Sequence, residues 1–300
     1  MPISFDPMNC RLCGNTINPF NTTVQINRVT QSFADCNYVC QVCRVGYSNS
    51  QTEASRTMIY ANHLENLPNG PDALRTDLER CLANAANVRN RDNKRNKFAF
   101  ATSEDALTWS VFWYLSHTNQ ICHALGDRCV STTALLLWGC PINDDPSGLT
   151  TLLHQIQVNE LGEAPNSKSE PDVIIETESH LYFIESKYGS PNSCKPEYRH
   201  WDTYLRTETI PLFGTPQIKI QQAGFEELTR NWVIGNMIAN RINKRFELIN
   251  LGPCAIEASS NQFAELINQT DADYRFLSWT RLMDKITIDD WFREYLNSKF

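Results

Sequence analysis

Two acidic residues and a lysine flank a pair of strand-like segments near the middle of the chain. Asp172 precedes the first segment, Glu185 lies at the end of the second, and Lys187 follows two residues later. Both segments are rich in β-branched and aromatic residues, and a polar break separates them, which predicts a β-hairpin. If Glu178 and Ser179 form its two-residue loop, Asp172 faces Glu185 directly, with Cβ atoms about 4.5–5.5 Å apart.

Two carboxylates held this close repel each other unless a cation lies between them. Mg²⁺ suits such a place, because it binds one or two carboxylates and fills its remaining positions with water and phosphate oxygens. The backbone carbonyl of Ser186 is a further candidate ligand. Lys187 shares the face of Glu185, where its ammonium can orient the attacking water or stabilise a pentavalent phosphorus. These parts predict phosphodiester hydrolysis.

This arrangement resembles the PD-(D/E)XK nuclease superfamily, which has the restriction-endonuclease-like fold. The matching residues are Pro171, Asp172, Glu185 and Lys187, with strand patterns between them, whereas an acid-any-Lys triplet alone would carry little weight. The resemblance implies a Mg²⁺-dependent endonuclease that cleaves DNA to leave 5′-phosphates, as restriction and other defence nucleases do. Because cutting a duplex generally needs two active sites, it also implies a homodimer. The alternative is a surface hairpin with a cross-strand ion pair.

The superfamily commonly supplies a further acid from the helix before the first core strand. Ser103 is a suitable N-cap for such a helix and is followed by two acids. Glu104 lies three residues before Leu107 and so belongs to the apolar stripe of the helix. A buried carboxylate is costly unless it is paired or bound to metal, which makes Glu104 the predicted additional acid. The alternative is that Glu104 only interacts favourably with the helix dipole.

The elements around the hairpin complete the predicted fold. Residues 134–139 form a short apolar run that predicts a buried central strand. The resemblance implies a helix after the metal-binding strand, for which we predict residues 217–240, and then a strand at 246–251. Residues from 276 onward predict two covering helices. Residues 101–300 are therefore expected to form an α/β domain with a restriction-endonuclease-like core, in which helices flank a central mixed sheet.

The predicted helix after the metal-binding strand carries three polar residues that are candidates to reach the site. They are Gln221, Gln222 and Arg230. A solvated position or a packing contact with the sheet is the alternative for each of them.

Two CxxC pairs near the N-terminus indicate a second metal. Cys10, Cys13, Cys40 and Cys43 offer four thiolates, the ligand set of a closed structural Zn²⁺ site. Cys36 is close enough in sequence to replace one of them. Residues 1–50 therefore predict a zinc-ribbon-like module that can hardly fold without its metal. Whether this module also contacts DNA or another subunit is left open.

Residues 51–100 predict a helical connector, with a helix that starts at Asp72. The connector ends in a basic cluster that only Asp92 opposes. The cluster comprises Arg89, Arg91, Lys94, Arg95 and Lys97. On an acidic chain this is the clearest candidate for contact with DNA phosphates, and a solvated loop is the alternative.

The composition limits the class of protein. A net charge of −7 argues against a protein that coats nucleic acid nonspecifically, but it does not exclude a nuclease. The sequence has no apolar run long enough to cross a membrane and no N-terminal secretory pattern, so we expect a cytoplasmic protein without membrane contact. The eleven cysteines are then expected to be thiols or metal ligands rather than disulfides.

Two other functions fit the same residues. One is a nuclease for RNA or single-stranded nucleic acid, because no residue pattern here reads a base directly. The other is a non-catalytic, zinc-containing nucleic-acid-binding protein whose nuclease core is inert. The complete set of two acids and a lysine argues against the second.

Overall fold

The computed structural model describes residues 6–20, 30, 32–49, 57–84, 91–126 and 131–300. The chain forms two compact units, which alternate along the sequence. The first comprises Met1–Arg75, Asp92–Leu107 and Ile288–Phe300, and the second comprises Thr76–Arg91 and Thr108–Thr287. Within the described ranges, no helix has the length and apolar character needed to cross a membrane.

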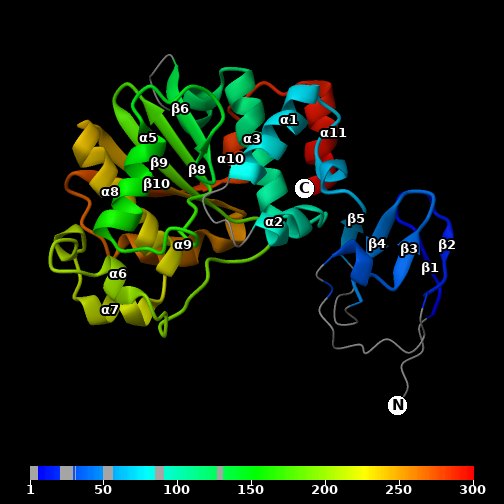
Figure 1. Ribbon diagram of the computed structural model, residues 1–300, viewed down its shortest axis with the longest axis horizontal. Helices are drawn as coiled ribbons and strands as arrows, with labels where there is room; N and C mark the ends of the chain where they lie inside the picture. The colour runs from blue at the N-terminus through cyan, green and yellow to red at the C-terminus, as the bar shows by residue number, and fades with distance from the viewer. Residues whose placement is uncertain (1–5, 21–29, 31, 50–56, 85–90, 127–130) are drawn as a thin grey trace. The chain divides into compact units, whose positions relative to one another are not determined.

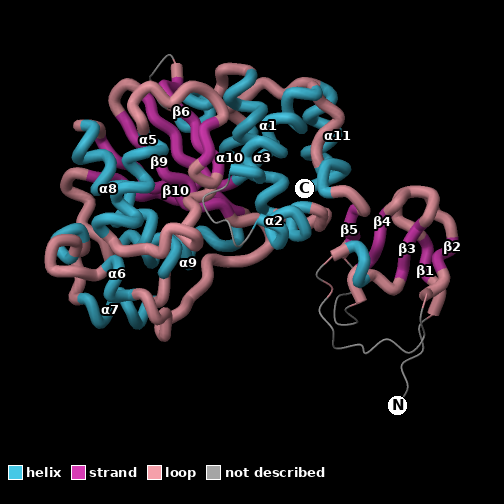
Figure 2. Tube along the Cα trace, viewed as in Figure 1, coloured by secondary structure: helices cyan, strands magenta, loops and turns pink. Residues whose placement is uncertain are grey.

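A six-stranded mixed sheet lies at the centre of the second unit (Figures 1 and 2), in the order β11-β10-β9-β8-β6-β7. Its strands are β6 (Thr132–Leu137), β7 (Cys140–Pro141), β8 (Val173–Thr177), β9 (His180–Ser186), β10 (Arg245–Gly252) and β11 (Ala272–Ser278). Neighbours from β7 to β9 are antiparallel, whereas β9, β10 and β11 run parallel. The predicted α/β fold with a central mixed sheet flanked by helices is confirmed at this level.

The predicted hairpin is present with the predicted loop. Strand β8 ends at Thr177 and β9 begins at His180, so Glu178 and Ser179 form the connection. Val173 pairs with Ile184, and the same register continues toward the loop. One step beyond Val173, this register places Asp172 opposite Glu185, as the sequence predicted.

Helices pack against this sheet or against the helices that flank it (Figure 1). They are α1 (Asp72–Asn84), α3 (Glu104–His117), α4 (Ile121–Leu125), α5 (Leu149–His154), α6 (Trp201–Tyr204), α7 (Gln217–Ala223), α8 (Glu226–Ile242), α9 (Glu257–Ala264) and α10 (Trp279–Met283). A π-helical turn follows α5 at Gln155–Glu160, and 3₁₀ turns lie at Ile210–Leu212 and Cys254–Ile256. Helix α8 packs on β9 and β10, where Trp232, Phe183 and Phe246 share one apolar core.

Two predicted elements are wrong. The single helix expected over residues 217–240 is broken into α7 and α8, because Gly224 adopts a left-handed conformation with φ 75°. A side chain there would also collide with the backbone nitrogen of Lys195. Phe276 and Leu277, which were assigned to a helix, lie in strand β11, and helix α10 starts only at Trp279.

The first unit contains two small sheets. Strands β1 (Met8–Asn9) and β2 (Thr16–Ile17) form one, and β3 (Tyr38–Cys40), β4 (Val45–Tyr47) and β5 (Met58–Tyr60) form the other. The remaining elements are 3₁₀ turns at Phe33–Asp35 and His63–Asn66, α2 (Arg91–Phe98) and the C-terminal α11 (Asp290–Lys299). Ile59 of β5 bridges to Phe100, which links the cysteine-containing sheet to the segment that follows α2.

Candidate functional site

Asp172, Glu185 and Lys187 lie at the open end of the β8–β9 hairpin. Asp172 accepts a hydrogen bond of 2.8 Å from the backbone N–H of Ser186, which fixes its carboxylate against the partner strand. Lys187 continues β9 and donates its own N–H to Leu251 of β10. Alternation along the strand then puts the side chains of Glu185 and Lys187 on the same face.

The Lys187 ammonium lies between two carboxylates. Its Nζ is 2.7 Å from Oε1 of Glu185 and 3.0 Å from Oε2 of Glu227, which lies in the first turn of α8. Glu185 is 3% exposed and Lys187 is 6% exposed, so these charges interact with little screening by water. A buried charge is tolerated when it is paired in this way.

The two carboxyl groups differ in acidity. Burial raises the pKa of Glu185 above its usual 4.5, even though Lys187 favours the ionised form. Burial would also raise the pKa of Glu227, but Lys187 and Arg230 outweigh it, and the net shift of that pKa is downward. For both carboxyl groups, burial opposes ionisation and the shared Lys187 favours it.

Helix α8 adds oxygen atoms without partners. Asn231 donates its amide to Oε2 of Glu185 at 2.8 Å, which leaves its own Oδ1 buried and, among the described residues, without a hydrogen bond. Oε2 of Glu226 is likewise buried without a hydrogen-bond partner among the described residues, although Oε1 of the same side chain accepts from Ser193 and Lys195. An ionised Glu185 can only accept hydrogen bonds, so the Asn231 amide cannot exchange its oxygen and nitrogen positions without losing this bond. Buried unpaired acceptors of this type mark a place where water or a cation belongs.

Arg230 occupies the same helix face one turn beyond Glu227. Its Nε is buried and, within the part of the chain that the structure describes, has no hydrogen-bond partner. Burial would lower the pKa of Arg230, but the nearby Tyr204, Glu185 and Glu227 raise it above its ordinary value. The guanidinium therefore stays charged, with hydrogen-bonding capacity to spare for an anion.

The segments around Asp172 are held by further contacts. Glu163 accepts hydrogen bonds from the Ser169 backbone and from the Tyr204 hydroxyl, which anchors the loop leading into β8. Trp138 forms the β6–β7 turn with φ 52° and donates its N–H to the carbonyl of Asp172. A tryptophan in this left-handed conformation is strained, and its ring stacks on Trp109 at 5.5 Å between centroids.

The predicted additional acid, Glu104, is the first residue of α3. The predicted cap is confirmed, because Ser103 Oγ accepts the backbone N–H of Ala106. Glu104 belongs to the first unit and Asp172 to the second. A role for Glu104 beside the strand carboxylates therefore stays a prediction.

The predicted basic cluster divides into different kinds of residue. Arg91, Arg95 and Lys97 lie on α2 with partly or fully exposed side chains, and Arg89 lies outside the described residues. Lys94 is only 6% exposed and lies 3.4 Å from Asp105. The burial and pairing of Lys94 do not fit the phosphate contact predicted for it.

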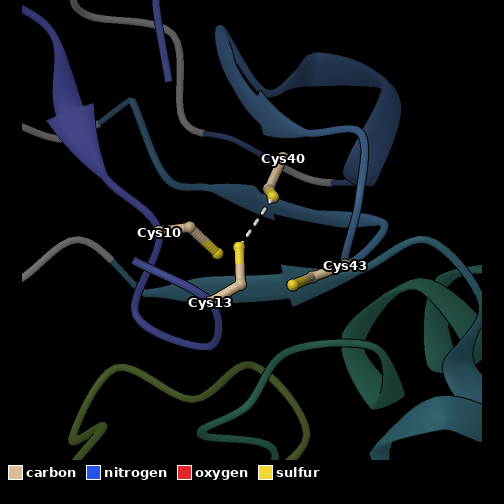
Figure 3. A group of neighbouring side chains, drawn as sticks. All are labelled: Cys10, Cys13, Cys40 and Cys43. Carbon is tan, nitrogen blue, oxygen red and sulfur yellow. Dashed lines mark hydrogen bonds between the residues drawn. The ribbon is translucent and has the colours of Figure 1, made fainter. Parts of the chain in front are cut away.

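The four predicted zinc ligands converge in the first unit (Figure 3). The Sγ atoms of Cys10, Cys13, Cys40 and Cys43 all lie within 4.8 Å of one another, and those of Cys13 and Cys40 are 3.7 Å apart. Zn–S bonds of about 2.3 Å in a tetrahedron place sulfurs about 3.8 Å apart. The cluster is therefore shaped to hold a metal ion such as zinc.

Cys10 and Cys13 lie in the turn between β1 and β2, whereas Cys40 ends β3 and Cys43 lies in the turn that leads to β4. The residue directly after each pair is left-handed, with φ 74° at Gly14 and 54° at Arg44, which curls both turns around the sulfurs. Burial would raise the pKa of Cys10, but hydrogen bonds from the Tyr47 hydroxyl and from the backbone at Cys13 outweigh it and lower the pKa to about 6. Cys10 is thus prepared to bind as a thiolate.

Other cysteines have different environments. Cys36 donates to the carbonyl of Ser32 and packs with Ile59 and Ala99, so it belongs to the core and not to the metal cluster. Cys122 is disulfide-bonded, so the expectation of thiols or metal ligands is wrong for this residue.

Sequence reasoning missed Glu226, Glu227 and Asn231. Of the three polar residues that the sequence offers as candidates, only Arg230 lies on α8. Gln221 and Gln222 lie on α7, before the break at Gly224. Polar residues at positions 227, 230 and 231 share one helix face by their spacing. That signal was present in the sequence, but it does not distinguish a face turned toward a buried acid from one turned toward water.

The chain was also compared with known proteins. No protein-family model, no curated protein sequence and no solved structure matches it.

Proposed function

We propose that this protein is a Mg²⁺-dependent endonuclease that hydrolyses phosphodiester bonds in DNA. The observation that carries the proposal is the hairpin register, which pairs Val173 with Ile184 and, continued by one step, supports facing positions for Asp172 and Glu185. The order of elements also agrees with the one that the family resemblance implies: α3, then strands β6, β8 and β9, then helix α8 and the parallel strand β10.

The donors at the site suit a hard cation. Asp172 and Glu185 would hold Mg²⁺, with the Ser186 carbonyl and the unpartnered Oδ1 of Asn231 as further oxygen ligands. When bound, this ion supplies charge neutralisation at the phosphate and an acidified water. Glu104 is the proposed additional acid.

The chain's own cations would handle the substrate. Lys187 is 2.7 Å from Glu185, so its ammonium would orient the attacking water or stabilise charge at the phosphorus. Arg230 would bind a phosphate oxygen with its spare donors. Arg91, Arg95 and Lys97 would contact the backbone of a longer substrate.

The cysteine cluster would hold Zn²⁺ as a structural ion, because four thiolates leave no open position for substrate. A homodimer in the cytoplasm remains part of the proposal, since cutting both strands of a duplex calls for two sites.

The test is incubation of the pure protein with supercoiled plasmid, with and without Mg²⁺. The wild type is expected to nick or cut the plasmid only with Mg²⁺, and Asp172→Asn should reduce the rate by at least about 1,000-fold. Asparagine can still accept the Ser186 N–H, so Tm should change little. Glu178→Gln is the matched control, because Glu178 is an exposed acid at the other end of the same hairpin.

Cleavage by Asp172→Asn at the parental rate would refute the assignment of the site. Single-stranded DNA and RNA should be assayed in parallel, since faster cleavage of either one identifies a different substrate for the same residues.

A further inference from the structure

The first unit contains a hollow of about 180 Å³ between the segment after β5 and the C-terminal helix α11. Its floor is formed by buried residues, among them Asn66, Leu67 and Tyr295. The side chain of Asn66 donates to the carbonyls of Phe98 and Phe100 at 2.8 and 2.7 Å, so it cannot turn without losing both bonds. The floor is therefore preorganised.

The wall of the hollow is equally well fixed. Arg75 donates to the carbonyl of Pro68 at 3.3 Å and so ties down the loop that contributes to the lining. A Cβ atom on Gly70 would collide with the ring of Trp291, so only glycine lets this loop and α11 approach so closely. This is a built cavity with a defined shape.

The rim combines aromatic rings with negative charge. Glu65 and Glu294 are exposed, and Tyr60 and Trp291 are partly exposed beside them. None of the described residues that line the hollow is basic. Aromatic faces attract organic cations, and carboxylates donate no hydrogen bond but accept them from ammonium groups.

We propose that this hollow binds an organic ammonium group, such as the end of a lysine side chain or of a polyamine. An amine of the chain itself already contacts its floor, because Lys299 Nζ lies 5.1 Å from the centroid of the Tyr295 ring and donates to Oδ1 of Asn66 at 2.6 Å. Nucleic-acid phosphates are repelled by the two carboxylates at the rim. The binding does not depend on nuclease activity.

The experiment is a titration followed by the indole N–H signal of Trp291 in two-dimensional ¹H–¹⁵N NMR of the whole protein. Trp291→Phe identifies this signal among the seven tryptophans. The probes are n-butylammonium chloride and neutral n-butanol, at constant ionic strength and pH 8. Burial lowers the pKa of Lys299 to about 7, so at pH 8 this neighbour opposes a second cation only weakly.

We expect a saturable shift with n-butylammonium and none with n-butanol over the same range. Glu65→Gln with Glu294→Gln should weaken the binding by roughly fivefold, as expected for two exposed ion pairs. Glu208→Gln with Glu265→Gln is the control, since it removes the same charge from exposed positions in the second unit and should leave the affinity unchanged.

Two further probes separate the sources of the ammonium group. Tighter binding of N-acetyl-lysinamide indicates a lysine side chain of a protein, and tighter binding of putrescine indicates a free polyamine. Equal saturation by n-butanol overturns the proposal, and so does binding of adenosine at lower concentration than any amine, which would make the hollow a nucleobase site.

Discussion

The two polar clusters of this protein differ in how their negative charge can be neutralised. In the first unit, four cysteine sulfurs lie within 4.8 Å of one another around a point where a metal ion fits. In the second unit, Glu185 and Glu227 are joined by Lys187, with Arg230 nearby. The first cluster could hold an ion from outside, whereas the second contains its own cations.

Under the proposed function, this difference distinguishes a structural metal site from an active site that exchanges its ligands. Four thiolates repel one another without an ion, so we expect metal binding and folding to be one event for the segment that holds Cys10, Cys13, Cys40 and Cys43. The charges of Glu185 and Glu227 are compensated in the folded chain by Lys187, so under the proposed function this site would form before metal and substrate bind. Preformed sites of this kind lose little free energy in reorganisation when the ligand binds.

The largest effect is expected from loss of the zinc ligands. Cys13→Ser or Cys40→Ser should abolish zinc binding and unfold the cysteine module, because structural zinc contributes on the order of 10–16 kcal/mol to such modules. Metal analysis of the pure protein and hydrogen exchange over residues 6–60 provide the measurements. Cys254→Ser, at an exposed cysteine outside the cluster, should retain one zinc per chain. A fully folded Cys40→Ser module without metal would remove the contrast between the two sites.

A smaller effect is expected from Arg230. Arg230→Lys keeps the positive charge but loses the planar fork of donors, so kcat/KM should fall by about 10- to 100-fold. Arg241→Lys is the matched control, since Arg241 lies on the same helix and pairs with Glu160 away from the site. The Arg230 variant should keep the wild-type Tm. An unchanged kcat/KM would limit the role of Arg230 to compensation of the buried acids.

The smallest effect concerns Glu185 in metal-free buffer. Burial raises the pKa of Glu185 in the folded state. Ionising Glu185 therefore lowers the free energy of unfolding as pH rises above 4.5, and this loss is complete above the raised pKa. Glu185→Gln is neutral at every pH and leaves Lys187 paired with Glu227. The variant should therefore match the wild type below pH 4.5 and melt slightly higher at pH 8, by about 2–4 °C for each kcal/mol gained.

At pH 8 with Mg²⁺, the wild type should instead melt at a higher temperature than Glu185→Gln, because only the wild type gains stability from an ion at Glu185. Thermal melts at both pH values, with and without Mg²⁺, provide the measurement. A Glu185→Gln variant that melts far below the wild type without metal would show that Lys187 cannot be compensated by Glu227 alone.

The hairpin was predictable because its evidence is local. A polar pair, Glu178 and Ser179, separates two runs of strand-forming residues, and the loop length then fixes the register that brings Asp172 opposite Glu185. The α3 cap at Ser103 and the two CxxC pairs are equally local patterns. Each of these features depends on residues close in sequence, for which spacing is sufficient evidence.

The missed features depend on contacts between distant segments. The apolar spacing around Phe276 suits a helix as well as a strand, and only pairing with β10 makes it β11. Gly224 breaks a helical pattern because the chain at Lys195 packs against it. Lys94 looks like its exposed neighbours in sequence, but its burial beside Asp105 is set by tertiary packing.

The loop of the β8–β9 hairpin is exposed and lies roughly 20 Å along the strand from Asp172. Surface turns usually accept added or missing residues. Here, an added residue that moved the pairing by one step would put Ile184 or Ser186, in place of Glu185, across from Asp172. Insertion tolerance at this turn is therefore governed by the two acids at the far end of the hairpin, although Glu178 and Ser179 take no part in their chemistry.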